Sequence, residues 1–132
     1  MIQSESSIRK KTVKGDNTLL TVDALKEYGA DTAQGLSRCM NNEGFYVRLV
    51  GMLASDQHAE ELVEAVSAGD LKKGFEAAHA LKGVLANLAL TPALEPVSEI
   101  TEYLRAGKVM DYTPLMERIV TEMARLKALI NG

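Results

Sequence analysis

The chain has 132 residues, 46% of them apolar, and a formal net charge of −3, which suits one domain with its own core. A single cysteine excludes an internal disulfide and fits a reducing cytosol, so we expect a cytoplasmic protein. No apolar run is long enough to enter a membrane. Basic residues gather before residue 17, and the more acidic remainder lacks the basic surface that nucleic acid requires.

The first stretch, residues 1–18, is polar and has no periodic apolar face. We expect a disordered leader or linker there and a folded domain over residues 19–132. Thr21 as N-cap and Gly29 as stop predict a short helix over residues 22–28. Asp31, followed three residues later by a glutamine, resembles a capping box and opens a second short helix to about residue 40.

A longer helical pattern follows. Asn41 or Asn42 predicts a helix start at residue 43, and apolar residues then keep a helical spacing to residue 68. Ser55-Asp56 interrupts this spacing, and the pattern fits either one long kinked helix or two shorter helices. Gly69 then ends the segment, and Asp70 caps the central helix, which is expected over residues 70–90.

Two more helices complete the chain. Thr91-Pro92 predicts an N-cap with proline at the first helical position, although Pro96 makes the first turn irregular or moves the regular start towards residue 95. Gly107 ends that helix, and Thr113-Pro114 starts the last. Its expected apolar face comprises Leu115, Ile119, Val120, Met123, Leu126 and Ile130.

The pattern contains no predicted strand and no repeat. Four substantial helices with short connections pack as antiparallel neighbours. The expected fold is therefore all-α: an antiparallel up-down four-helix bundle, with two short N-terminal helices covering one end.

The central helix carries the candidate site. On a helical wheel, His79 falls on the polar face, opposite the apolar stripe, together with Glu76, Gly83 and Asn87. Lys82 and Gly83, three and four residues after His79, are its neighbours on the helix surface. Glycine inside a helix costs about 1 kcal/mol relative to alanine. Room beside an exposed nucleophile is one reason to accept that cost.

The run His79-Ala80-Leu81-Lys82-Gly83, followed by Ala86-Asn87-Leu88, resembles the signature of histidine-containing phosphotransfer (HPt) domains. That signature is His-x-Leu-Lys-Gly, a small residue and, shortly after, a Leu-Gly pair. Gly35-Leu36 with Arg38, and then Phe45-Tyr46, resemble the segment before the family's bundle. The chain departs from the pattern at Val84-Leu85, where small polar residues are common, and at Leu88-Ala89.

The resemblance implies a phosphocarrier of a multistep two-component phosphorelay and not an enzyme. His79 would accept a phosphoryl group from the aspartyl phosphate of a receiver domain and pass it to another receiver aspartate. Imidazole suits this role because much of it is neutral and nucleophilic at pH 7. Lys82 would offset the phosphoryl charge, and Gly83 would leave access for the partner. The domain would need no cofactor of its own, since the receiver would supply Mg²⁺.

The expected partners are response-regulator receiver domains and a hybrid sensor kinase, bound by a monomer. Antiparallel pairing across the hairpin turns places residues of the neighbouring helices level with His79, where they would help a partner to dock. The alternative for each of them is an ordinary position on a solvated helix edge. Two histidines and one cysteine give no metal-binding spacing. The alternative function is an HPt-like bundle that docks onto receivers without carrying phosphate. The candidate docking residues are His58, Glu76, Ala86, Asn87 and Glu102.

Overall fold

The computed structural model describes residues 20–132, so the leader expected over residues 1–18 lies outside the described residues. The described part forms helices and turns and contains no strand, which confirms the all-α class. The elements are α1 (Val22–Tyr28), α2 (Thr32–Arg38), α3 (Glu43–Gly51), the 3₁₀ helix η2 (Met52–Ser55), α4 (His58–Ser67), α5 (Leu71–Asn87), α6 (Thr91–Arg105) and α7 (Thr113–Asn131).

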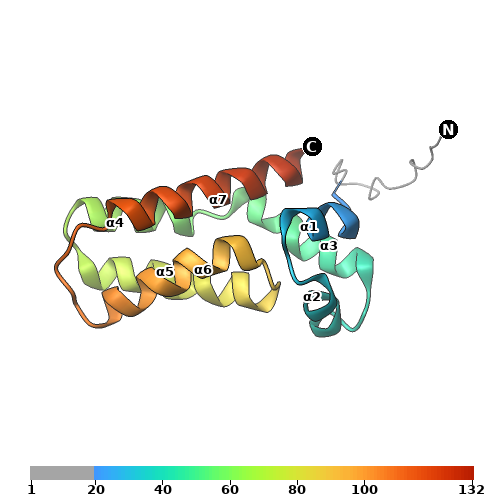
Figure 1. Ribbon diagram of the computed structural model, residues 1–132, viewed down its shortest axis with the longest axis horizontal. Coiled ribbons are helices and arrows are strands. Elements are labelled where there is room, and N and C mark those ends of the chain that lie inside the picture. Colours follow the sequence, from blue (N-terminus) through green and yellow to red (C-terminus); the bar gives the residue numbers. More distant parts are fainter. Residues whose placement is uncertain (1–19) are drawn as a thin grey trace.

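The four longest helices form a bundle. α5 packs between α4 and α6, α6 packs on α7, and α7 returns to α4, so the four helices enclose one core. The chain turns back at residues 68–70 and 106–112 at one end of the bundle and at residues 88–90 near the other (Figure 1). The central helix α5 therefore has packed neighbours on two sides and leaves its outer face to solvent.

The core consists of the apolar stripes that the sequence predicts. Three predicted members are wrong: Phe45, Met52 and Val120 are exposed. Val120 of α7 is 47% exposed, because it follows the buried Ile119 and so points about 100° away from it around the helix. The fully or almost fully buried side chains of the bundle include Leu62, Ala78, Leu81, Leu85, Val97, Ile100, Leu104, Met123 and Leu126.

Three short helices, not two, cover one end of the bundle. The chain breaks after α3, passes through η2 and restarts at α4, so the segment expected over residues 43–68 is two helices and not one. The break has a local cause at Asp56, whose carboxylate accepts the backbone N–H of His58 at 3.0 Å and so begins α4. As a result α3 lies with α1 and α2 beside the end of the bundle (Figure 1).

Most predicted helix boundaries are confirmed. Four of the predicted N-caps each accept a backbone N–H three residues on, at 3.0–3.2 Å, and these are Thr21, Asp31, Asn42 and Asp70. The start of α6 differs from the prediction: it is regular from Thr91, with Leu90 as N-cap and Pro96 inside the helix. Pro96 removes only one backbone bond, and its ring is buried against the core, which offsets that loss.

The end of α5 is held by the short helices. The helix ends at Asn87, three residues before the predicted end, and Ala89 adopts a left-handed conformation with φ 57°. Ala89 stands where the HPt pattern has glycine, the residue that suits such a backbone. The carbonyls left over at this helix end accept bonds from the short-helix segment: Asp31 N–H donates to Ala89 at 2.9 Å, and the Arg38 guanidinium donates to Ala86.

Tyr46 of α3 makes the third of these links. Its buried hydroxyl donates to the Leu88 carbonyl at 2.9 Å. The ring lies so close to Gly35 of α2 that a Cβ there would come within 2.5 Å of it, so this position requires glycine. The Gly35 and Tyr46 positions of the HPt resemblance thus form one contact, which fixes α2 and α3 on the end of the helix that carries His79.

Candidate functional site

His79 is exposed at the middle of α5, as predicted from the helical wheel. Its ring stacks on the ring of Phe75, one turn earlier, with centroids 5.4 Å apart and planes inclined by 19°. The guanidinium carbon of Arg105, in the last turn of α6, lies 4.9 Å from the centroid of the Phe75 ring. The imidazole is therefore held along the surface of α5 instead of moving freely in solvent.

An open groove of about 770 Å³ runs beside the histidine. One wall is α5, with His79, Gly83 and Asn87, and the other wall is formed by α3 and η2. Most of the second wall is apolar, and its Met52 is 65% exposed. The residues of the second wall are Leu49, Met52, Leu53 and Asp56.

Gly83 faces open space. A Cβ placed on it would meet no atom within 4 Å, so internal packing does not require glycine at this position. Glycine destabilises a helix interior by about 0.5–1 kcal/mol relative to alanine, and no internal contact explains why Gly83 stands here. The open space it leaves is part of the groove beside His79.

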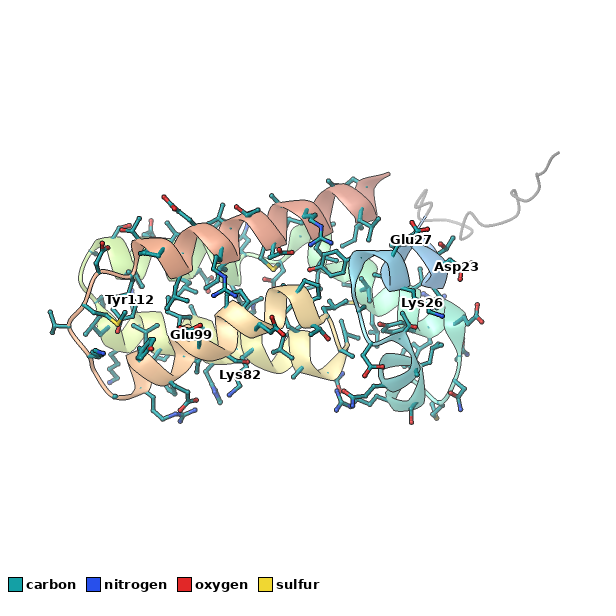
Figure 2. The ribbon with its side chains drawn as sticks, viewed as in Figure 1. Asp23, Lys26, Glu27, Lys82, Glu99 and Tyr112 are labelled. Atoms are coloured by element: carbon teal, nitrogen blue, oxygen red, sulfur yellow. The ribbon has the colours of Figure 1, made fainter. Side chains whose placement is uncertain are left out.

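Lys82 lies on the other flank of His79, towards α6. Its Nζ is 3.6 Å from Oε2 of Glu102, and the same carboxylate accepts two bonds from the Arg105 guanidinium, at 3.3 and 3.5 Å. The hydrogen bond from Arg105, with the charges of Arg105 and Lys82, lowers the pKa of the Glu102 carboxyl from its usual value. Figure 2 places Lys82 midway along the bundle, well apart from the labelled residues of α1.

The other predicted docking residues divide between two surfaces. His58 and Glu76 line a separate groove between α4 and α5, where they lie with Ala80. The His58 ring is held by Asp56, with Nδ1 and Oδ1 2.7 Å apart. Asn87 lines the groove beside His79, and Ala86 offers its carbonyl to Arg38. The structure thus groups His79, Gly83 and Asn87, and it sets Lys82 with Glu102 on one side and His58 with Glu76 on the other.

Sequence reasoning missed two parts of this site. Phe75 contacts His79, and Arg105 contacts Phe75; the spacing of four residues between Phe75 and His79 was a signal that could have revealed the stack. The apolar wall from α3 and η2 had no such signal. Its place across the groove from His79 depends on the break around η2 and Asp56, which the sequence pattern left open.

Comparison with known families decides what kind of domain this is. Residues 53–129, more than half of the chain, match the model of the Hpt domain. The chain belongs to the Hpt domain family. Comparisons with curated proteins and with solved structures found no significant match.

Hpt domains are phosphocarrier modules of two-component phosphorelays, not catalytic enzymes, and they interact with response-regulator receiver domains. The matched residues cover α4, α5, α6 and α7 up to residue 129 and include His79, while α1, α2 and α3 lie before them. No helix in residues 20–132 has the length and apolarity to cross a membrane. In the same part of the chain, no three histidine, cysteine or acidic side chains group as metal ligands would.

Proposed function

We propose that His79 is the phosphoacceptor of this Hpt domain and that residues 20–132 act together as the carrier. The observation that supports this most is the single exposed histidine at the middle of α5, beside an open groove and a glycine with no packing role. The proposal includes a monomeric carrier in the cytoplasm that receives phosphate from a hybrid sensor kinase and delivers it to a second receiver.

The chemistry needs one nucleophile from this chain. A neutral ring nitrogen of His79 attacks the phosphorus of a receiver's aspartyl phosphate. The P–O bond breaks, a P–N bond forms, and the receiver aspartate leaves as a carboxylate. The other ring nitrogen keeps its proton. Mg²⁺ and the cationic groups of the receiver stabilise the charge on the phosphoryl group during transfer, so this chain has only to present the ring.

The surroundings of His79 support presentation of this kind. The stack on Phe75 restricts the imidazole, and the open space at Gly83 lets a partner approach along α5. The apolar wall with Met52 is an exposed apolar surface that a receiver could bury on docking, beside the reacting atoms. Lys82 would act as a point cation for the transferred group.

The test is phosphotransfer from a receiver domain that carries a labelled aspartyl phosphate. We expect label on the wild-type protein in an acid-labile, base-stable form, as a phosphorylated histidine requires. His79→Gln should abolish the label. The chain has only two histidines, so His58→Gln is the matched control and should still take up label.

Two results would contradict the assignment. Label that survives in His79→Gln would move the acceptor elsewhere. A wild-type protein that binds the phosphorylated receiver but never takes up label would favour the alternative, an Hpt-like bundle that docks without carrying phosphate. Repeating the assay across the receiver domains of the source organism would identify the donor and the acceptor.

A further inference from the structure

A single carboxylate on α6 holds two cations beside the proposed acceptor. Glu102 accepts a pair of hydrogen bonds from Arg105, and its Oε2 lies 3.6 Å from the Nζ of Lys82. All three side chains remain partly or largely exposed, so none of these contacts is needed to fill the core. A second anion next to this carboxylate would compete with it for the two cations.

That second anion is a phosphoryl group on His79. It would bring a charge of about −2 to a residue three positions before Lys82 on the same helix face. Arg105 is also close by, since it lies over the Phe75 ring on which His79 stacks. Of the two cations that Glu102 holds, Lys82 is thus a helix-surface neighbour of His79 and Arg105 is linked to it through Phe75, so the phosphoryl group and the carboxylate would compete for them.

We propose that Glu102 is a positioning residue that competes with the phosphoryl group for Lys82 and so makes phosphorylated His79 a more ready donor. This inference rests on the proposed role of His79. In onward transfer the P–N bond breaks, a P–O bond forms on the receiver aspartate, and the ring nitrogen recovers its electron pair. Glu102 takes no part in bonding. It repels the phosphoryl charge and recovers Lys82 once that charge has left.

The sign of the effect follows from the charges. Removing the carboxylate charge frees Lys82 for the phosphoryl group and removes a nearby like charge, so both changes favour the phosphorylated form. Because the groups are exposed, water and salt weaken the interaction, and the change expected at low ionic strength is roughly two- to fivefold in the equilibrium ratio. At about 1 M salt, where the screening length falls to about 3 Å, the change should largely disappear.

The experiment compares the wild-type protein with Glu102→Gln and Glu99→Gln, each equilibrated with one phosphorylated receiver at low and at high salt. Glu99 is the matched control, because it is an exposed glutamate on the same helix that pairs with Arg118 of α7, at 3.5 Å, and not with α5 (Figure 2). At low salt Glu102→Gln should raise the phosphorylated share, lengthen the lifetime of phosphohistidine and slow onward transfer. Glu99→Gln should behave as wild type.

A double substitution tests the route through Lys82. In a Lys82→Gln background, Glu102→Gln should change the equilibrium ratio far less than it does alone. The proposal is overturned if Glu102→Gln matches wild type at low salt, if its effect is equally large at high salt, or if Glu99→Gln has the same effect.

These failures differ from failure of the proposed function. If His79 is not the acceptor, its replacement leaves labelling intact or the wild-type protein carries no label at all. If only the role of Glu102 is wrong, wild-type labelling depends on His79 and the three proteins reach the same equilibrium.

Discussion

The imidazole ring of His79 stacks on the phenyl ring of Phe75, with centroids 5.4 Å apart and an angle of 19° between the planes. Phe75 itself is partly buried and packs against the hydrophobic core, so the stack couples an exposed ring to the interior of the bundle. Under the proposed function, a receiver that docks on α5 would therefore meet a histidine whose orientation is restricted before binding. This lowers the entropy lost on reaching the reactive geometry.

Replacing Phe75 should slow transfer without unfolding the protein. Phe75→Leu keeps most of the apolar contact but removes the stack, and aromatic pairs contribute about 0.5–1.5 kcal/mol beyond their buried area. We expect a fall of roughly two- to tenfold in the transfer rate, measured with a saturating phosphorylated receiver. Phe75→Tyr retains the ring and is the control. Equal rates for the wild type and Phe75→Leu would show that the stack has no kinetic role.

Gly83→Ala should separate stability from function. No atom lies within 4 Å of the added Cβ, so the variant should gain about 0.5–1 kcal/mol in free energy of unfolding from helix propensity. The added methyl group enters the groove beside His79, so transfer should fall, by about tenfold if a receiver approaches as closely as the open space allows. Denaturant unfolding and transfer kinetics measure the two effects.

Gly44→Ala is the control for that variant. Gly44 lies in α3, where a Cβ would make only an ordinary 3.6 Å contact with the Asn42 side chain, and it does not line the groove. Its substitution should leave transfer unchanged. If Gly83→Ala gains stability and also transfers at the wild-type rate, the glycine does not serve partner access.

Met52→Gln tests the apolar wall. Met52 is 65% exposed, so a polar replacement should leave the free energy of unfolding almost unchanged. If a receiver buries this side chain, its affinity should fall by roughly five- to thirtyfold, since burial of such a side chain contributes about 1–2 kcal/mol. Affinity can be measured by titration calorimetry with an unphosphorylated receiver.

Val109→Gln is the comparison for Met52→Gln. Val109 is 91% exposed in the connection between α6 and α7, at the end of the bundle opposite α1 to α3 (Figure 1). Its replacement should leave the affinity unchanged. Identical affinities for both variants and the wild type would exclude Met52 from the docking surface.

Tyr46→Phe should weaken the attachment of the short helices. The hydroxyl of Tyr46 is buried and donates to the Leu88 carbonyl, and leaving that carbonyl without its partner costs about 1–3 kcal/mol. Unfolding at pH 7 should show this loss, whereas Tyr103→Phe, at a half-buried ring on α6, should change stability little.

The same tyrosine gives a pH dependence with a defined sign. Burial, with smaller contributions from Cys39 and Asp31, raises the pKa of Tyr46 to about 12, against about 10 in an unfolded chain. Below about pH 10 both states keep the proton and its contribution is fully present. Between about pH 10 and 12 only the unfolded state loses the proton, so stability falls, by roughly 2–3 kcal/mol in total. Between about pH 10 and 12, Tyr46→Phe should lose less free energy of unfolding than the wild type. If the two proteins lose stability in parallel over this range, Tyr46 is not the source of the pH dependence.

Local chemistry made much of this fold predictable. Each predicted N-cap, from Thr21 to Asp70, is a short polar side chain whose hydrogen bond depends only on the next three residues. The placement of His79 on the outer face of α5 likewise follows from helical periodicity. The start of α6 was mispredicted because the burial of the Pro96 ring, a tertiary contact, offsets the hydrogen bond that proline removes.

The parts of the site that could not be predicted depend on distant contacts. The pairing of Lys82 with Glu102 joins two helices, and the wall at Met52 lies across the groove from His79 only because of the break around η2. The end of α5 at Asn87 was mispredicted for the same reason, because the links from Asp31 and Tyr46 accommodate a left-handed alanine at Ala89, just after the helix. Periodicity along one helix contains no information about such contacts.

The break between α3 and α4 lies close to the point where the match to the Hpt domain family begins. The histidine and its bundle lie within residues 53–129, the part that the Hpt family shares, whereas the wall residues Leu49 and Met52 lie just before it. If the proposed function holds, the wall that a receiver would contact is therefore encoded partly outside the stretch that carries the histidine, since only Leu53 and Asp56 of the wall lie within residues 53–129. We therefore expect substitutions at Leu49 and Met52 to change which receiver the domain prefers while the helix that carries His79 stays unchanged.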